Sequence, residues 1–209
     1  ALITGGNVSI RVSETGTSYY NVFVDKKLHR VVKVCGTDTL INVVSGIDKR
    51  IHSLKIQKRS EGEFGKTTIH QFVLSASGRL MEETEVRTRH IEFIGNSLTC
   101  GYGTDGKHRD DPFLVETENC NRTFAAMIAR YYDADYTLIA HSGRGAARNY
   151  GDSVRVSKVT MKDRMLNTFD EDFTLRWNFT AYCPDLVVVN LGSNDFSTEP
   201  HPYKREFIK

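Results

Sequence analysis

The sequence predicts two domains of different class, an antiparallel β-sandwich over residues 1–88 and an α/β domain over residues 89–209. Two observations predict this division. The first part consists of short strand-like runs separated by turn residues, whereas the second alternates apolar β-branched runs with a helical pattern. The composition is that of a folded protein, because 39% of the 209 residues are hydrophobic and 26% are charged.

The first part contains six predicted strands and no predicted helix. Residues 8–12 (VSIRV) alternate apolar and polar side chains, which is the period of a strand with one buried face. The other predicted strands cover residues 20–24, 30–33, 40–44, 51–58 and 68–74. Closely spaced short strands with turn residues between them are typical of an antiparallel sandwich.

The second part contains three predicted strands around one clear helix. Residues 91–94, 136–140 and 186–191 are the strands, and apolar residues at helical spacing predict a helix over 122–132. Continuous β-branched runs that alternate with helices are typical of parallel strands buried on both faces. Three strands make a thin sheet, so we expect this domain to be incomplete at its C-terminus, with more sequence after Lys209.

Charge and cysteine content exclude several classes of function. The 28 Lys and Arg residues against 26 Asp and Glu give a net charge of +2, and the interspersed charges do not predict a nucleic-acid partner. No apolar run approaches the ~20 residues of a membrane span. The cysteines lack metal-site spacing, so no metal or other cofactor is expected, and their disulfide state stays open. These cysteines are Cys35, Cys100, Cys120 and Cys183.

The loops that follow the three strands carry the most chemistry. In open α/β sheets, reactive groups lie beyond the carboxyl ends of the strands. The loops here are residues 95–99 (GNSLT), 141–145 (HSGRG) and 192–195 (GSND). Ser97 leaves its strand through a glycine, which allows the sharp turn that presents a nucleophilic hydroxyl.

Two other residues of these loops suit an acyl-transfer site. Gly143 lacks a side chain, so its N–H can approach a developing oxyanion, and Asn194 offers a side-chain amide. With the N–H of Ser97, these donors would form a three-point oxyanion hole. Each residue alone is more often structural, as a turn glycine or an Asx-turn residue, but the combination favours a hydrolase.

The three loops resemble blocks one, two and three of the SGNH (GDSL) hydrolase superfamily. Residues 91–103 (IEFIGNSLTCGYG), 148–151 (RNYG) and 190–197 (NLGSNDFS) further resemble carbohydrate esterase family two, the two-domain acetyl esterases of plant polysaccharides such as the acetyl xylan esterases. The resemblance implies an N-terminal jelly roll and a flavodoxin-like, three-layer hydrolase domain. It also implies that Ser97 is the nucleophile and that Ser97, Gly143 and Asn194 form the oxyanion hole.

The same resemblance implies the partners and the location of the protein. The expected substrate is an acetylated polysaccharide or oligosaccharide such as xylan, with no cofactor and no metal. A polymeric substrate implies a secreted, periplasmic or cell-surface protein whose signal peptide has been removed. The residues leave the polysaccharide and the oligomeric state open.

Two departures from the superfamily pattern stand out. Asn96 occupies a position where block one usually has aspartate, and we expect its amide to order the nucleophile loop by hydrogen bonding. The later Asp-x-x-His block that carries the catalytic base is absent, because the residue three before His201 is Thr198. We therefore expect the base to lie after Lys209.

Side chains beside the loops are candidates for substrate binding. Aromatic rings can stack on sugars, and polar groups can bind their hydroxyls, although packing explains each residue as well. The candidates are Tyr102, His141, Arg148, Asn149, Tyr150 and Trp177. Two other functions stay open, a lipase or thioesterase of the same superfamily and a carbohydrate-binding protein without turnover.

Overall fold

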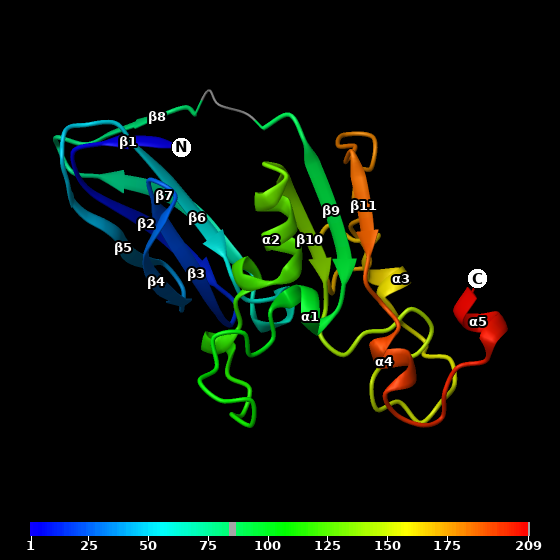
Figure 1. Cartoon of the computed structure of the whole chain (residues 1–209). Coiled ribbons are helices and arrows are strands. Elements are labelled where there is room, and N and C mark those ends of the chain that lie inside the picture. The colour runs from blue at the N-terminus through cyan, green and yellow to red at the C-terminus, as the bar shows by residue number, and fades with distance from the viewer. Residues whose placement is uncertain (84–86, 209) are drawn as a thin grey trace. The chain divides into compact units, whose positions relative to one another are not determined.

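The structure, a computed structural model, describes residues 1–83 and 87–208. The chain forms two compact units, one of Ala1–Ser60 with Phe64–Val86 and one of Glu61–Glu63 with Arg87–Lys209 (Figure 1). The short segment Glu61–Glu63 is thus part of the second unit although it lies within the first part of the sequence. In the portion of the chain that the structure describes, every helix is too short or too polar to cross a bilayer.

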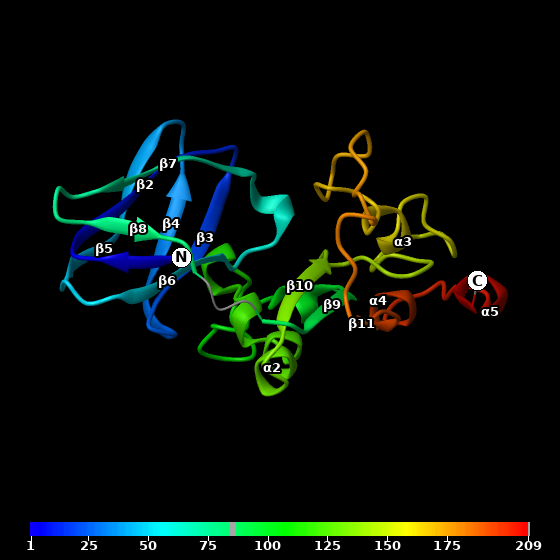
Figure 2. The same cartoon turned by 90° about the horizontal axis from the view of Figure 1, so that it is seen from above.

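The first unit consists of two antiparallel sheets around one core (Figures 1 and 2). Its strands are β1 (Leu2–Thr4), β2 (Gly6–Glu14), β3 (Thr17–Val24), β4 (Lys27–Cys35), β5 (Thr39–Ile47), β6 (His52–Lys58), β7 (Thr67–Leu74) and β8 (Arg79–Met81). One sheet has the order β4-β3-β6-β1-β8 and the other the order β5-β2-β7. On β2, Val8, Ile10 and Val12 are buried in the core, as the alternating pattern predicts.

Five of the six predicted strands lie within β2, β3, β4, β5 and β7, and the sixth, residues 51–58, begins one residue before β6. β1 and β8 have three residues each, which is too short for an alternating pattern to be recognised. A short 3₁₀-helix, η1 (Gly62–Phe64), lies between β6 and β7. The jelly-roll connection implied by the resemblance stays a prediction.

The second unit has a parallel sheet of order β10-β9-β11. Its strands are β9 (His90–Gly95), β10 (Asp135–Ala140) and β11 (Leu186–Val189). Helix α2 (Phe124–Tyr131) packs on this sheet, and Ala125 and Ala129 join Ile91 and Phe93 in a small core. β11 ends two residues before the predicted boundary.

Several short helices complete this unit. They are α1 (Ser97–Cys100), η2 (Val115–Thr117), η3 (Cys120–Arg122), α3 (Met161–Arg164), α4 (Ser193–Phe196) and α5 (Lys204–Ile208). α1 and α4 begin within a few residues of the ends of β9 and β11, so the chain turns from strand to helix at two of the three predicted loops. All four cysteines are free thiols.

Candidate active site

The three predicted loops lie at one edge of the sheet. β9 pairs in parallel with β10 on one side and with β11 on the other, so the carboxyl ends of all three strands meet there (Figure 1). Ser97 follows β9, Gly143 follows β10 and Asn194 follows β11. Residues that are nearly a hundred positions apart in the sequence therefore come to neighbouring loops.

The turn that carries Ser97 is built by its two preceding residues. A Cβ added to Gly95 would lie 2.0 Å from Thr99 Oγ1, so glycine is required at this position. Asn96 caps α1, because its Oδ1 accepts a hydrogen bond of 3.2 Å from the Leu98 N–H. Ser97 is then the first helical residue.

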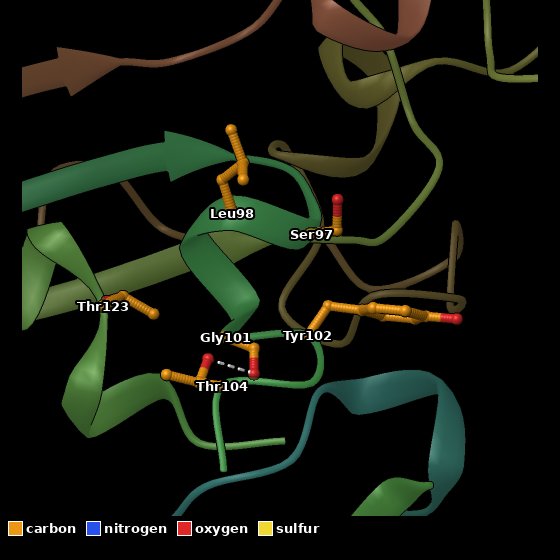
Figure 3. Close-up of a pocket in the computed structure, with 6 residues that line it drawn as sticks. All are labelled: Ser97, Leu98, Gly101, Tyr102, Thr104 and Thr123. Carbon is orange, nitrogen blue, oxygen red and sulfur yellow. Dashed lines mark hydrogen bonds between the residues drawn. The ribbon is translucent and has the colours of Figure 1, made fainter. Parts of the chain in front are cut away.

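Ser97 lines a pocket of about 210 Å³ (Figure 3). The residues around it are Ser97, Leu98, Gly101, Tyr102, Thr104 and Thr123. Figure 3 shows the Ser97 hydroxyl pointing away from the ribbon, without a hydrogen bond to the other residues drawn, whereas Thr104 Oγ1 donates to Gly101 O at 2.5 Å. Ser97 thus lines a small pocket, and its hydroxyl has no hydrogen-bond partner among the residues drawn.

Two backbone donors at this edge are unused. Within residues 1–83 and 87–208, the N–H groups of Ser97 and Gly143 make no hydrogen bond. Gly143 has a φ of +75°, a left-handed conformation that favours glycine, and a Cβ there would meet nothing within 4 Å. Both donors are therefore available to an anionic ligand atom.

Asn194 contributes a third donor. The residue is 9% exposed, and its Nδ2 donates one hydrogen bond of 2.8 Å to Arg144 O. An amide nitrogen carries two hydrogens, so the second remains for a ligand.

Hydrogen bonds tie the loops together. Asn96 Nδ2 donates to Ser193 Oγ at 2.9 Å, which joins the loop after β9 to the loop after β11. Asn194 joins the loop after β11 to the loop after β10 through Arg144 O. The oxygen and the nitrogen of the Asn96 amide therefore both hold the turn that carries Ser97 by hydrogen bonds, as we expected for an amide at this position.

Asp195 holds the loop after β10 in shape. Its fully buried carboxylate accepts hydrogen bonds from the N–H groups of three successive residues, and the donor–acceptor distances are 2.7–3.0 Å. The donors are Ala146, Ala147 and Arg148. A Cβ on Gly145 would lie 2.6 Å from Asp195 Oδ2, so this glycine permits the close approach.

Arg148 and Asn149 are engaged inside the same loop. Arg148 is fully buried, and its guanidinium donates to backbone oxygens of the surrounding chain, among them Thr198 O at 2.8 Å and Val154 O at 3.1 Å. Asn149 accepts from the Gly145 N–H and donates to a backbone oxygen of the same loop. Their predicted contact with substrate stays a prediction, and the visible role of both is to shape the loop.

His141 lies between two carboxyl groups rather than at Ser97. Its Nδ1 is 2.5 Å from Asp170 Oδ2 and its Nε2 is 3.2 Å from Glu63 Oε2, and the residue is 1% exposed. Burial alone would raise the pKa of Asp170, but the hydrogen bond from His141 and the nearby Arg164 charge outweigh it and lower this pKa. Across the described residues, no histidine forms a hydrogen bond with the Ser97 hydroxyl.

The three aromatic candidates are partly exposed. Tyr102 lines the pocket and stacks on Phe113, with ring centroids 3.8 Å apart and an interplanar angle of 12°. Tyr150 and Trp177 are 60% and 39% exposed. Tyr102 adjoins the nucleophile pocket, and the sugar contacts of all three stay predictions.

Glu61 and Glu118 form a buried acidic cluster beside these loops. Neither residue belongs to a sequence motif. The Glu61 N–H donates to Glu118 Oε2 at 2.8 Å, and Glu61 Oε2 accepts from the Ser142 N–H at 2.7 Å. Burial, together with the charge of Glu61, raises the pKa of Glu118 to about 9. Burial and the same two glutamates also raise the pKa of the Cys100 thiol.

The groups that could hold a metal ion lie in the same region. Among the described residues they are Glu61 with Cys100 and Glu118, Glu61 with Glu63 and His141, and His141 with Asp170 and Glu171.

Replacing Glu118 with glutamine is expected to change how stability depends on pH. The native carboxyl keeps its proton to about pH 9, whereas an unfolded glutamate releases it near pH ~4.3. Between these values the unfolded chain binds fewer protons, so the free energy of unfolding falls as pH rises, by at most about 1.4 kcal/mol per pH unit. Glutamine does not titrate, so the melting temperature of Glu118→Gln minus that of wild type should rise by several degrees from about pH 5 to about pH 8.5. A difference that stays constant in scanning calorimetry would contradict the raised pKa.

Family models match both parts of the chain. Residues 1–99 match the carbohydrate esterase 2 N-terminal family, and residues 91–208 match the GDSL-like lipase/acylhydrolase family.

Curated relatives and a solved structure are also similar. The chain is 34% identical over 194 residues to the cellulase/esterase CelE of Acetivibrio thermocellus, covering 93% of this chain and 23% of the relative. It is 31% identical over 185 residues to an acetylxylan esterase / glucomannan deacetylase of Cellvibrio japonicus, covering 83% of this chain and 50% of the relative. A family two carbohydrate esterase from Clostridium thermocellum, solved in complex with cellohexaose, superposes with a TM-score of 0.91 at 33% identity. That match covers 99% of this chain and 62% of the solved chain.

Proposed function

Because the chain belongs to the GDSL-like lipase/acylhydrolase family and carries the N-terminal part of carbohydrate esterase 2, we propose that it is a serine esterase. Its proposed reaction removes acetyl groups from O-acetylated plant polysaccharide, through an acyl-enzyme. The chain spans half or less of the two curated relatives described above and 62% of the solved one, so this is a proposal for the whole protein.

The observation that carries the proposal is that one serine and three hydrogen-bond donors lie on neighbouring loops at one edge of the sheet. Ser97 lines a pocket, and the neighbouring loops carry two N–H groups without an acceptor among the described residues, those of Ser97 and Gly143. The Asn194 amide has a hydrogen left for a ligand. Donors arranged beforehand around a developing oxyanion are a large source of rate acceleration in acyl transfer.

The proposed reaction has two stages. Ser97 Oγ attacks the acetyl carbonyl carbon, its proton passes to a base, and the oxyanion accepts hydrogen bonds from the Ser97 N–H, the Gly143 N–H and the Asn194 amide. The intermediate expels the sugar oxygen, which takes the proton, and leaves an acetyl group on Ser97. Water then attacks the carbonyl carbon of the acetyl group and gives a proton to the base. The bond from this carbon to Ser97 Oγ breaks, Ser97 Oγ takes the proton, and acetate is released. The base that accepts the Ser97 proton is not assigned to a residue, because no histidine among the described residues forms a hydrogen bond with the Ser97 hydroxyl.

The substrate class is inferred from the pocket and the relatives. The half-exposed ring of Tyr102, which lines the pocket beside Ser97, offers a face to a sugar. One curated relative is named an acetylxylan esterase / glucomannan deacetylase. We propose xylan or a related hemicellulose as the polymer, and a secreted, periplasmic or cell-surface location, where such a polymer is accessible.

A second candidate function is glycan binding without turnover. It is favoured by the lack of a histidine at Ser97 in the described residues and by a solved relative that binds cellohexaose. Titration calorimetry with xylan and glucan oligosaccharides, run beside the esterase assay, separates the two functions. Binding by the full-length protein without acetate release would favour this second function.

The esterase is tested by acetate release from acetylated xylan and acetylated glucomannan with the full-length protein. A series of nitrophenyl esters provides the control for acyl length. We expect acetate release from both polymers and a kcat/KM that falls from acetyl to longer acyl groups. Faster turnover of long acyl groups than of acetyl would indicate a lipase or thioesterase instead.

A further inference from the structure

We propose that Glu61 is a positioning residue for this esterase, because its carboxylate ties the helix of the nucleophile to the loop of the oxyanion donor. The inference rests on the proposed function and assigns a role to a residue outside the three strand-end loops. Glu61 precedes Ser97 by 36 positions, and it belongs to the same compact unit.

One carboxylate oxygen of Glu61 connects the helix that begins at Ser97 to the loop that contains Gly143. Glu61 Oε2 accepts the Ser142 N–H at 2.7 Å and the Cys100 thiol at 3.4 Å, measured from the donor nitrogen and sulfur. Cys100 is the last residue of α1, the helix that begins at Ser97. Ser142 directly precedes Gly143, whose N–H is one of the unused donors.

This contact completes a set of ties among the loops. Asn96 joins the first loop to the third through Ser193, and Asn194 joins the third to the second through Arg144. Glu61 joins the first loop to the second. The relative position of Ser97 and Gly143 therefore depends on a side chain that neither loop provides.

Glu61 is itself held in place. It is 7% exposed, and its own N–H donates to Glu118 Oε2 at 2.8 Å. Glu118 is fully buried and neutral at pH 7, since burial raises its pKa to about 9. The backbone and the carboxylate of Glu61 are therefore both fixed, which suits a positioning role.

The inference predicts a loss in kcat rather than in KM. Gly143 would act on the oxyanion, which exists only after attack, so its displacement weakens the transition state more than the bound substrate. Misplacement by about 1 Å can cost a factor of about 10². We expect Glu61→Met to lower kcat for nitrophenyl acetate ten- to a hundredfold, with KM within about threefold of wild type.

Rescue by a conservative variant distinguishes positioning from general packing. The amide oxygen of Glu61→Gln can still accept the Ser142 N–H, so this variant should keep kcat within about fivefold of wild type. Glu82→Met, at an exposed position of the first unit, is the matched control and should not change kcat. All variants are compared as full-length proteins, with folding checked by circular dichroism.

If Glu61→Met does not fold, a second pair of variants tests the contact from the Cys100 thiol to Glu61 Oε2. Cys100→Ala removes the thiol donor, and Cys100→Ser keeps a donor of similar size. We expect kcat of the alanine variant to be several-fold below that of the serine variant.

Equal kcat values for wild type, Glu61→Met and both Cys100 variants would overturn the inference while leaving the esterase intact. A kcat of Glu61→Gln as low as that of Glu61→Met would also overturn the inference. If wild type releases no acetate, the proposed function fails first and the inference falls with it.

Discussion

Ser97→Ala in the full-length protein is expected to lower kcat for acetate release by at least about 10³-fold. The variant loses the only atom that can form the acetyl-enzyme in the proposed mechanism, and what remains is the help of the oxyanion donors to direct attack by water. KM for acetylated xylan should stay within a few-fold of wild type, because the hydroxyl contributes little to binding the polymer. The measurement is initial-rate acetate release over a range of substrate concentrations.

The matched control for this variant is Ser45→Ala. Ser45 is an exposed residue of β5 in the first unit, so the same chemical change occurs outside the residues that line the pocket. It should leave kcat unchanged. If Ser97→Ala retained wild-type turnover, Ser97 would not be the nucleophile and the proposed mechanism would be wrong.

Asn194→Ala is expected to lower kcat by about 10²–10³-fold, the usual cost of losing one oxyanion donor. Part of the loss arises because Asn194 also donates to Arg144 O and so holds the loop that contains Gly143. The melting temperature reports on the loop contribution, because losing the hydrogen bond to Arg144 O should lower stability, whereas losing the oxyanion donor alone should not. Kinetics on nitrophenyl acetate provide the rate.

Asn178→Ala is the control for this amide. Asn178 is exposed, and its side chain makes a local turn with Thr180, so its removal should not affect turnover. If Asn194→Ala kept kcat within twofold of wild type, the Asn194 amide would not stabilise the transition state.

The sequence was enough to predict six strands of the first unit, the three strands of the parallel sheet and the loops that follow them. The runs at residues 91–94 and 186–191 are short, continuous and apolar, which is a strong local signal for buried parallel strands. Ser97, Gly143 and Asn194 follow such strands directly, so the topology alone brings them to one edge. The family matches confirm the resemblance deduced from these loops.

Short elements were not predictable. α1 and α4 have four residues each, less than two helical turns, so no apolar period can develop within them. Their presence depends on caps such as Asn96 and on the tertiary contacts of Asp195. From sequence, these segments are therefore predicted only as loops after the strands.

The acidic cluster was not predictable either. Glu61 and Glu118 are 57 positions apart, and neither lies in a motif. A glutamate in a polar stretch normally predicts a solvated surface, and only the fold buries this pair. The position of His141 between Asp170 and Glu63 likewise depends on chain segments that the local pattern does not connect.

The most direct test of the account is to trap the acetyl-enzyme. The full-length protein is mixed with an activated acetyl ester, quenched in acid during turnover and digested, and the peptide that contains Ser97 is analysed by mass spectrometry. The account predicts one added acetyl group on Ser97 that is lost on longer incubation and absent from Ser97→Ala. Turnover with an unmodified Ser97, or with the acetyl group on another residue, would contradict it.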